Sequence, residues 1–174
     1  MDELPADGDA GRTRPAPTAT QRALGLLVRR EHSRKELAVK LAARGIDKDQ
    51  ARAAIDRLAS DGWQDDARFA ESLARSRMAA GYGPVRIRAE LGTHGIGAGQ
   101  VGLAIAACEA DWNELARALI ARRFKPGSLK DPGQRRKAID LLLRRGFDRA
   151  SAFGAVDGIS GAVDAPVPAW DAAG

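Results

Sequence analysis

Cysteine, histidine and aromatic residues are scarce in this chain of 174 residues, which has one cysteine, two histidines and 5% aromatic residues. Because Cys108 is the only cysteine, no disulfide can form within the chain, as is typical of proteins from the reducing cytoplasm. One cysteine and two histidines are also too few for a closed zinc site. We therefore expect no metal site and a core built mainly from aliphatic side chains.

Long apolar runs are missing as well. The longest, at 101–108, falls far short of the ~20 residues that a membrane-spanning helix needs. Residues 1–14 begin with acids and contain no apolar stretch, unlike a secretory signal. We therefore expect a cytoplasmic protein that has no membrane partner.

Basic residues and helix formers dominate what is present. Ala, Leu and Arg are plentiful, whereas Val and Thr are sparse, and this balance favours helices over sheets. Lys and Arg number 28 against 23 acids, which gives a net charge of +5. A basic balance points to polyanions or acidic protein surfaces as partners. A solvated surface of mixed charge is the alternative explanation.

One helix-end pattern recurs three times along the chain. In each copy a Leu lies four residues before a Gly, and a large apolar residue follows that Gly. The copies read LAARGI at 41–46, LGTHGI at 91–96 and LLRRGF at 142–147. A glycine just past a helix end adopts the left-handed conformation, and the next apolar residue packs back on the last turn. The glycines lie 50 and 51 residues apart, at Gly45, Gly95 and Gly146.

Helices are predicted on both sides of each of these glycines, because apolar residues continue at helical spacing. The helices before the glycines have recognisable starts, namely a capping box at Ser33 with Glu36, and prolines at 84 and 132. A further helical segment precedes each of them, at 21–30, 66–80 and 111–123.

The sequence thus predicts an all-α protein with three tandem three-helix repeats in an elongated, curved array. A unit of about 50 residues buries too little surface to be robust alone, so neighbouring units should share contacts. Pro, Gly and Ala without periodicity predict disordered tails. We place the N-terminal tail at 1–19, the units at 20–63, 64–110 and 111–159, and the C-terminal tail at 160–174.

Motifs that could carry chemistry have simpler structural explanations. A G-x-G-x-x-G at 97–102 lacks the preceding strand that a dinucleotide site requires. Asp65 and Asp66 could form an acid–base pair, but Asp is strongly preferred at helix starts. Cys108 falls on a predicted buried stripe, and His94 occupies a basic position near a helix C-terminus. No nucleophile stands with a base, so we predict no catalytic residue, no cofactor and no enzymatic activity.

The basic residues are the most informative set. In helix-turn-helix proteins the last helix of a three-helix unit reads the major groove, yet the segment 97–110 contains no Lys or Arg. We therefore expect any DNA binding to be weak and independent of sequence. Arginine predominates over lysine, which favours a contact surface over solubility alone. The candidate contact residues on the first and middle helices are Arg68, Arg75, Arg86, Arg88, Arg136, Lys137 and Arg144.

Several segments, in their order and spacing, resemble the RecX family of bacterial recombination regulators over residues 21–158. They read RREHSRKEL at 29–37, DARFA at 66–70, RSR at 75–77, GYGPVRIRAEL at 81–91 and GI at 95–96. The N-terminal extension and the segment after Gly158 match nothing in the family, so their roles stay open.

The resemblance implies a non-enzymatic regulator of the RecA recombinase. Such proteins are three-repeat helical arrays that bind the RecA–single-stranded DNA filament and restrain its ATPase, recombinase and co-protease activities, and thereby modulate DNA repair and the SOS response. We expect the protein to be a monomer. The resemblance also implies roles for Tyr82, Arg86 and Arg88, which lie in the family's best-marked segment. Capping of filament ends and coating of the groove are both compatible with the sequence. A nonspecific nucleic-acid-binding or architectural protein is the alternative.

Overall fold

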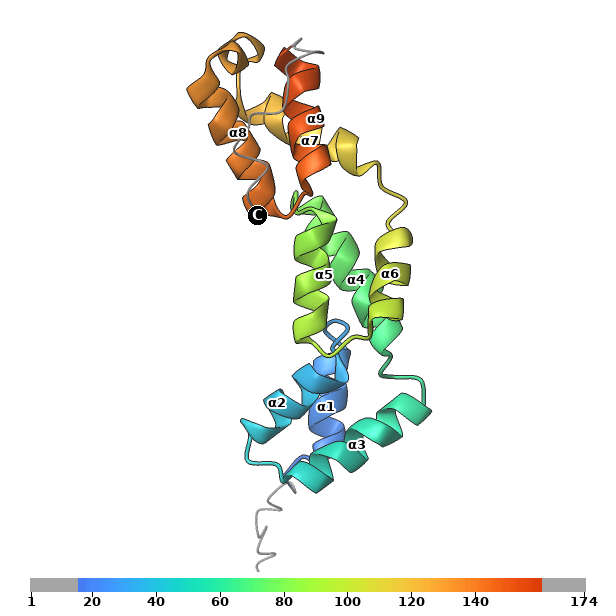
Figure 1. Cartoon of the computed structure of the whole chain (residues 1–174). Coiled ribbons are helices and arrows are strands. Elements are labelled where there is room, and N and C mark those ends of the chain that lie inside the picture. Colours follow the sequence, from blue (N-terminus) through green and yellow to red (C-terminus); the bar gives the residue numbers. More distant parts are fainter. Residues whose placement is uncertain (1–15, 161–174) are drawn as a thin grey trace, which may run out of the picture.

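The structure is a computed structural model that describes residues 16–160. Within this range it contains nine α-helices, one short 3₁₀ helix and no strand, which confirms the all-α prediction. Figure 1 shows three groups of helices that follow one another in an elongated array. Apart from residues 16–19 and Ser160, the predicted tails lie outside the described residues.

Each unit contains three α-helices, and the third also contains the 3₁₀ helix. Unit 1 comprises α1 (Ala19–Leu27), α2 (Arg34–Ala42) and α3 (Lys48–Ser60). Unit 2 comprises α4 (Asp66–Ala79), α5 (Pro84–Thr93) and α6 (Ala98–Ala106). Unit 3 comprises α7 (Trp112–Arg123), the 3₁₀ helix η1 (Pro126–Lys130), α8 (Pro132–Arg145) and α9 (Arg149–Ser160).

Local signals explain where the middle helices begin and end. Ser33 Oγ accepts a hydrogen bond from Glu36 N at 3.0 Å and so caps α2, while Pro84 and Pro132 begin α5 and α8. The glycines after these helices have φ values of +75°, +79° and +85°, as the repeat predicts, at Gly45, Gly95 and Gly146. The apolar residue after each glycine donates its backbone N–H to the Leu carbonyl five residues earlier.

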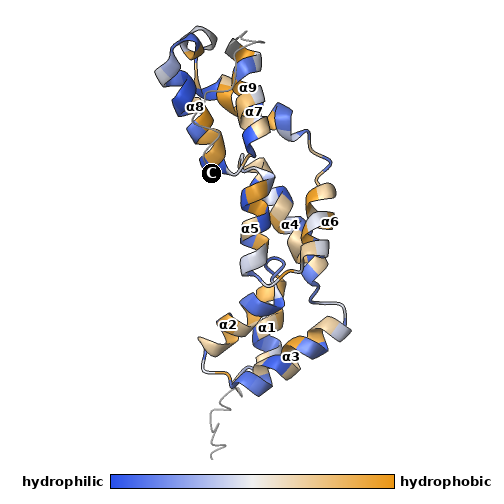
Figure 2. Ribbon diagram, viewed as in Figure 1, coloured by the Kyte–Doolittle hydropathy of each residue, from blue (hydrophilic) through white to orange (hydrophobic). Residues whose placement is uncertain are grey.

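Each unit has its own hydrophobic core. The innermost side chains of the three cores include Leu37 and Leu41, Ile87 and Leu91, and Ala138 and Leu142. Helices pack mainly against partners of the same unit, such as α4 against α6. Figure 2 shows the hydrophobic residues on the sides where these helices meet, with α8 strongly hydrophilic on its outer side. The array therefore consists of three small cores in series.

Two features of the cores have no counterpart in the sequence repeat. The 3₁₀ helix η1 inserts Leu129 into the core of unit 3, where the side chain is 1% exposed. Trp112, at the start of α7, packs against the cores of both unit 2 and unit 3. Its indole ring is thus a hydrophobic link between two otherwise separate cores.

The middle helices of the three units meet end to end, which positions the surface discussed below. Backbone N–H groups at the start of α5 bond carbonyls at the end of α8, and Lys35 Nζ at the start of α2 donates to Thr93 O at the end of α5. Figure 1 shows α8, α5 and α2 succeeding one another along the array. At a rise of 1.5 Å per residue, the three helices together extend roughly 50 Å.

Candidate partner-binding surface

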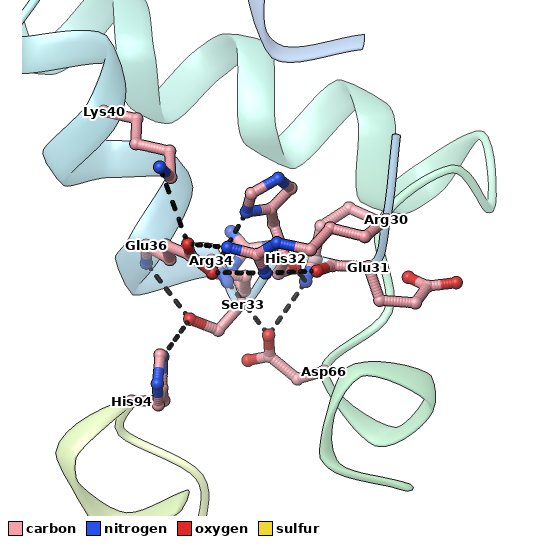
Figure 3. A network of polar contacts seen from close by, with 10 residues as sticks. Arg30, Glu31, His32, Ser33, Arg34, Glu36, Lys40, Asp66 and His94 are labelled. Carbon is pink, nitrogen blue, oxygen red and sulfur yellow. Dashed lines mark hydrogen bonds and ion pairs between the residues drawn. The ribbon is translucent and has the colours of Figure 1, made fainter. Parts of the chain in front are cut away.

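Side chains make the junction between units 1 and 2, drawn in Figure 3. Ser33 Oγ, which caps α2, also lies 3.1 Å from His94 Nδ1 at the end of α5. The carboxylate of Asp66 accepts a hydrogen bond from Arg34 N at 3.0 Å. The same Asp66 oxygen accepts from Gln64 Nε2 at 2.8 Å. A side chain from α4 therefore satisfies a free backbone donor at the start of α2 in the neighbouring unit.

A buried histidine lies beside this junction. His32 is 3% exposed, and its Nδ1 lies 3.0 Å from the Glu36 carboxylate, which also pairs with Arg30 and, at 3.7 Å, with Lys40. Burial lowers the pKa of His32, although the nearby Glu36 acts in the opposite direction. Burial alone would raise the pKa of Glu36, but hydrogen bonding to Arg30 and His32 lowers it. The folded state therefore favours a neutral His32 beside an ionised Glu36.

This arrangement predicts how stability depends on pH. Because the folded-state pKa of His32 is lowered below 6.5, the unfolded chain takes up a proton first as the pH falls through that value. The free energy of unfolding should therefore decrease between pH 7.5 and pH 5. Glu36, whose pKa lies below 4.5, stays ionised in this window. Thermal melts of the parent and of His32→Gln should show a smaller pH slope for the variant, and parallel curves would contradict the prediction.

Backbone groups make the junction between units 2 and 3. Gly83 N donates to Arg145 O at 2.9 Å, and Val85 N donates to Gly146 O at 3.0 Å. The positive end of the α5 dipole thus meets the negative end of the α8 dipole. A Cβ atom on Gly83 would lie 2.3 Å from Gly146 O, and one on Gly146 would lie 2.3 Å from Arg86 Cβ. Only glycine fits at either position.

Two arginines contact one aromatic ring at the same junction. The guanidinium carbons of Arg86 and Arg145 lie 4.6 Å and 5.0 Å from the centroid of the Tyr82 ring. Arg145 also donates to Ala80 O at 3.0 Å. Cation–π contacts of this kind stabilise by about 0.5–1 kcal/mol at exposed sites. Tyr82, a candidate contact residue, therefore also helps to hold units 2 and 3 together through Arg145, whereas its contact with Arg86 lies within unit 2.

Two other candidate arginines are engaged within the chain. Arg68 pairs with Glu31 at 2.9 Å and donates to the carbonyls of Gly62 and Trp63, so it braces the junction between units 1 and 2. Arg75 pairs with Glu71 along α4 at 2.7 Å. Their roles toward a partner stay predictions, and both would have to exchange an internal contact for an external one.

The remaining four candidates form what we call the basic surface: Arg88, Arg136, Lys137 and Arg144. All four are exposed, and none makes an ion pair within residues 16–160. Three lie on α8, opposite the buried Ala138 and Leu142, and the fourth lies on α5, which meets α8 end to end. Unpaired cations on two helices in series can meet several anionic groups of one extended partner at once.

The motifs that could have carried chemistry have structural roles. Asp65 caps α4 by accepting from Ala67 N and Arg68 N. Gly97 precedes α6, and a helix rather than a strand comes before it. Cys108 Sγ lies 3.5 Å from Ala104 O. Burial raises the pKa of this thiol, so less of it is present as the reactive thiolate. Among the described residues, no cluster of potential metal ligands occurs, and no helix is long and apolar enough to cross a membrane.

Sequence reasoning missed the residues that join the units. The sequence identifies Asp66 only as a residue of a helix start and Arg145 only as a basic residue near a helix end. Gly83 precedes Pro84 in a pattern that predicts only a helix start. The one usable signal is Gly146, which the repeat identifies as a helix end but not as a contact point for α5.

The fold and surface define a tandem three-helix repeat protein with exposed, unpaired cations on two helices that meet end to end. Comparison with known proteins identifies a single family. Residues 19–58 match the domain described as "RecX, first three-helix domain", and residues 65–104 match "RecX, second three-helix domain". The chain is 58% identical over 148 residues to the regulatory protein RecX of Xanthomonas axonopodis pv. citri (strain 306), covering 85% of this chain and 91% of that protein.

A second relative and a solved structure agree with this match. The regulatory protein RecX of Stenotrophomonas maltophilia (strain R551-3) is 60% identical over 131 residues, covering 75% of this chain and 80% of that protein. The crystal structure of RecX from Lactobacillus salivarius shares the fold with a TM-score of 0.70 at 23% identity, over 81% of this chain and 94% of that chain. The chain belongs to the RecX family of regulatory proteins, as its sequence motifs predicted.

Proposed function

We propose that the protein binds the RecA–single-stranded DNA filament and inhibits its ATPase, recombinase and co-protease activities without catalysing a reaction itself. Such inhibition in the cytoplasm would modulate DNA repair and the SOS response. Membership of a family of regulatory proteins supports the proposal. The observation that carries it is the basic surface of four exposed and unpaired cations on helices that meet end to end.

The shape of the array supports a filament as the partner. A filament presents the same surface repeatedly, and an elongated monomer with several weak contact points can engage more than one copy. Contacts linked in this way gain through effective concentration, by ~10²–10⁴ over a single contact. A compact domain of one unit would not have this gain.

A nonspecific nucleic-acid-binding or architectural protein is the second candidate, and the basic surface also favours it. Phosphate contacts by exposed cations bind any sequence and weaken steeply with salt. The third helix of unit 2, α6, has no basic residue with which to read bases. We therefore expect weak binding to free single-stranded DNA, and much tighter binding to the RecA filament.

Removing part of the basic surface should weaken inhibition. We expect Arg136→Ala with Lys137→Ala to inhibit the DNA-dependent ATPase of RecA several-fold less than the parent. Adding Arg88→Ala and Arg144→Ala should weaken it about tenfold or more. For free DNA, removing one cation that binds a phosphate should reduce the logarithmic salt slope by about one unit. Titrations of RecA ATPase and of labelled single-stranded DNA over a range of salt measure both effects.

The matched control changes charge equally at another place. Arg52→Ala with Arg57→Ala removes two arginines of α3, whose side chains are 81% and 76% exposed, and leaves the basic surface intact. This variant should inhibit like the parent. A folded quadruple variant with full inhibition would show that the basic surface only keeps the protein soluble.

A further inference from the structure

A groove runs along unit 2 between α4 and α5, the two helices that lie side by side in Figure 1. It consists of two adjoining hollows, of about 430 Å³ and 520 Å³, that share Arg77 and Glu90 in their walls. The α4 wall is one helical face, with residues at 69, 72, 73, 76 and 77. The α5 wall is likewise one face, at 86, 89, 90, 93 and 94.

The two walls run antiparallel, so the groove has distinct ends. At one end the rings of Phe69 and His94 lie 4.8 Å apart, and Leu73 adds a partly buried apolar side chain. At the other end Tyr82 and Arg86 line the groove. From His94 to Arg86 the α5 wall extends about 12 Å, which matches about four residues of extended peptide.

Charge along the groove disfavours a nucleic acid. Glu90 in the middle is held by Arg77 through two hydrogen bonds of 2.8 Å and 2.6 Å, and Glu36 at the apolar end is held by Arg30. The Arg77 guanidinium lowers the pKa of Glu90, so this carboxylate stays ionised at neutral pH. A continuous phosphate backbone would have to pass these two carboxylates and that of Glu31, which also lines the groove.

At the Tyr82 end, by contrast, an arginine has no carboxylate in direct contact, although its charge acts on Glu90. Arg86 stacks on Tyr82 and makes no ion pair within the part of the chain that the structure describes. A single carboxylate could accept hydrogen bonds there from the guanidinium. The exposed Ser72 and Ser76 offer hydroxyl donors and acceptors for a peptide backbone between the two ends. Thr93 Oγ1 donates to Glu90 O at 2.7 Å and can still accept.

A helix would fit this groove poorly. A docked amphipathic helix needs a row of apolar anchors, and the walls offer only Phe69, Leu73 and Ala89. We propose that the groove between α4 and α5 binds an extended peptide segment of a protein partner, with an acidic side chain at Arg86 and an apolar side chain at Leu73. This inference rests on the proposed function. The groove would bind the protein component of the filament, and the basic surface would bind its anionic groups.

A peptide titration tests the groove without RecA. The probe is an acetylated, amidated peptide of five residues, leucine-serine-glycine-serine-aspartate, added to the ¹⁵N-labelled full chain and followed by NMR. We expect millimolar binding, with shift changes on the groove faces of α4 and α5. The same peptide ending in asparagine should bind several-fold more weakly. Shifts elsewhere, or none at tens of millimolar, would overturn the proposal. So would a ten-residue oligothymidylate that shifts the groove residues and displaces the peptide.

A steric block then links the groove to regulation. Ser76 is exposed on the α4 wall, so Ser76→Trp should fill the groove without disturbing the core, whereas Ser76→Ala leaves it open. We expect Ser76→Trp, unlike Ser76→Ala, to lose peptide binding and to inhibit RecA ATPase about tenfold less than the parent. Its binding to free single-stranded DNA should be unchanged. Unchanged inhibition by a folded Ser76→Trp would overturn the groove as the filament contact. If the parent itself does not inhibit RecA, the proposed function fails, and the peptide titration still decides the groove.

Discussion

Gly83→Ala should uncouple units 2 and 3 while each unit stays folded. The added Cβ would lie 2.3 Å from Gly146 O and 2.5 Å from Phe147 N, and these are backbone atoms that cannot rotate away. The ends of α5 and α8 would have to separate, which breaks the bonds Gly83 N–Arg145 O and Val85 N–Gly146 O. Each lost bond should cost about 0.5–1.5 kcal/mol, and the steric clash adds to this cost. The rigid contact between α5 and α8 would then be lost, although Trp112 still packs against both cores.

The expected consequences are a larger radius of gyration in solution scattering and fast hydrogen exchange at Val85 N–H. Under the proposed function, inhibition of RecA ATPase should weaken about tenfold, because the distance between the contact points of units 2 and 3 is no longer fixed. Gly92→Ala is the matched control, since Gly92 lies in α5, the helix that Gly83 precedes, and has nothing within 4 Å of an added Cβ. It should be stabilising by about 0.5–1 kcal/mol. A Gly83→Ala protein with the parent's dimensions and exchange rates would disprove the rigid junction.

Much of the fold could be predicted because each unit contains its own local signals. The helix ends at Gly45, Gly95 and Gly146 need only a few neighbouring residues to define them, and all three adopt the left-handed conformation. The apolar spacing on either side of them likewise identifies core residues, such as Leu91 and Leu142, from a single helix at a time. Capping by Ser33 and Asp65 follows from the same short-range physics.

The junctions and the groove could not be predicted, because they depend on contacts between distant parts of the chain. Asp66 reads as a residue of its own helix start, yet its carboxylate binds Arg34 N, 32 residues earlier. Arg68 reads as an exposed cation, and only the structure places Glu31 beside it. Leu129 lies in a segment too short to show periodicity. Pairings of this kind leave no repeated pattern in one sequence.

Leu91→Ala should have the largest effect on stability, and the effect should be confined to one unit. Leu91 is fully buried in the core of unit 2, and deleting such a side chain costs about 2–5 kcal/mol. At about 0.05–0.15 kcal/mol per residue, a unit of this size has only a few kcal/mol of its own. Unit 2 should therefore unfold locally, while the separate cores around Leu41 and Leu142 persist.

Hydrogen exchange followed by mass spectrometry would resolve the three units in one experiment. In Leu91→Ala, peptides from α4, α5 and α6 should lose protection, whereas those from α1–α3 and α8–α9 keep most of theirs. The matched control is Leu103→Ala, which changes a side chain that is 72% exposed on α6. It should change the free energy of unfolding by less than about 0.5 kcal/mol. Because unit 2 forms both junctions, local unfolding there should also abolish the proposed inhibition of RecA. Equal loss of protection in all three units would mean instead that the end-to-end contacts of α8, α5 and α2 make the array one cooperative block.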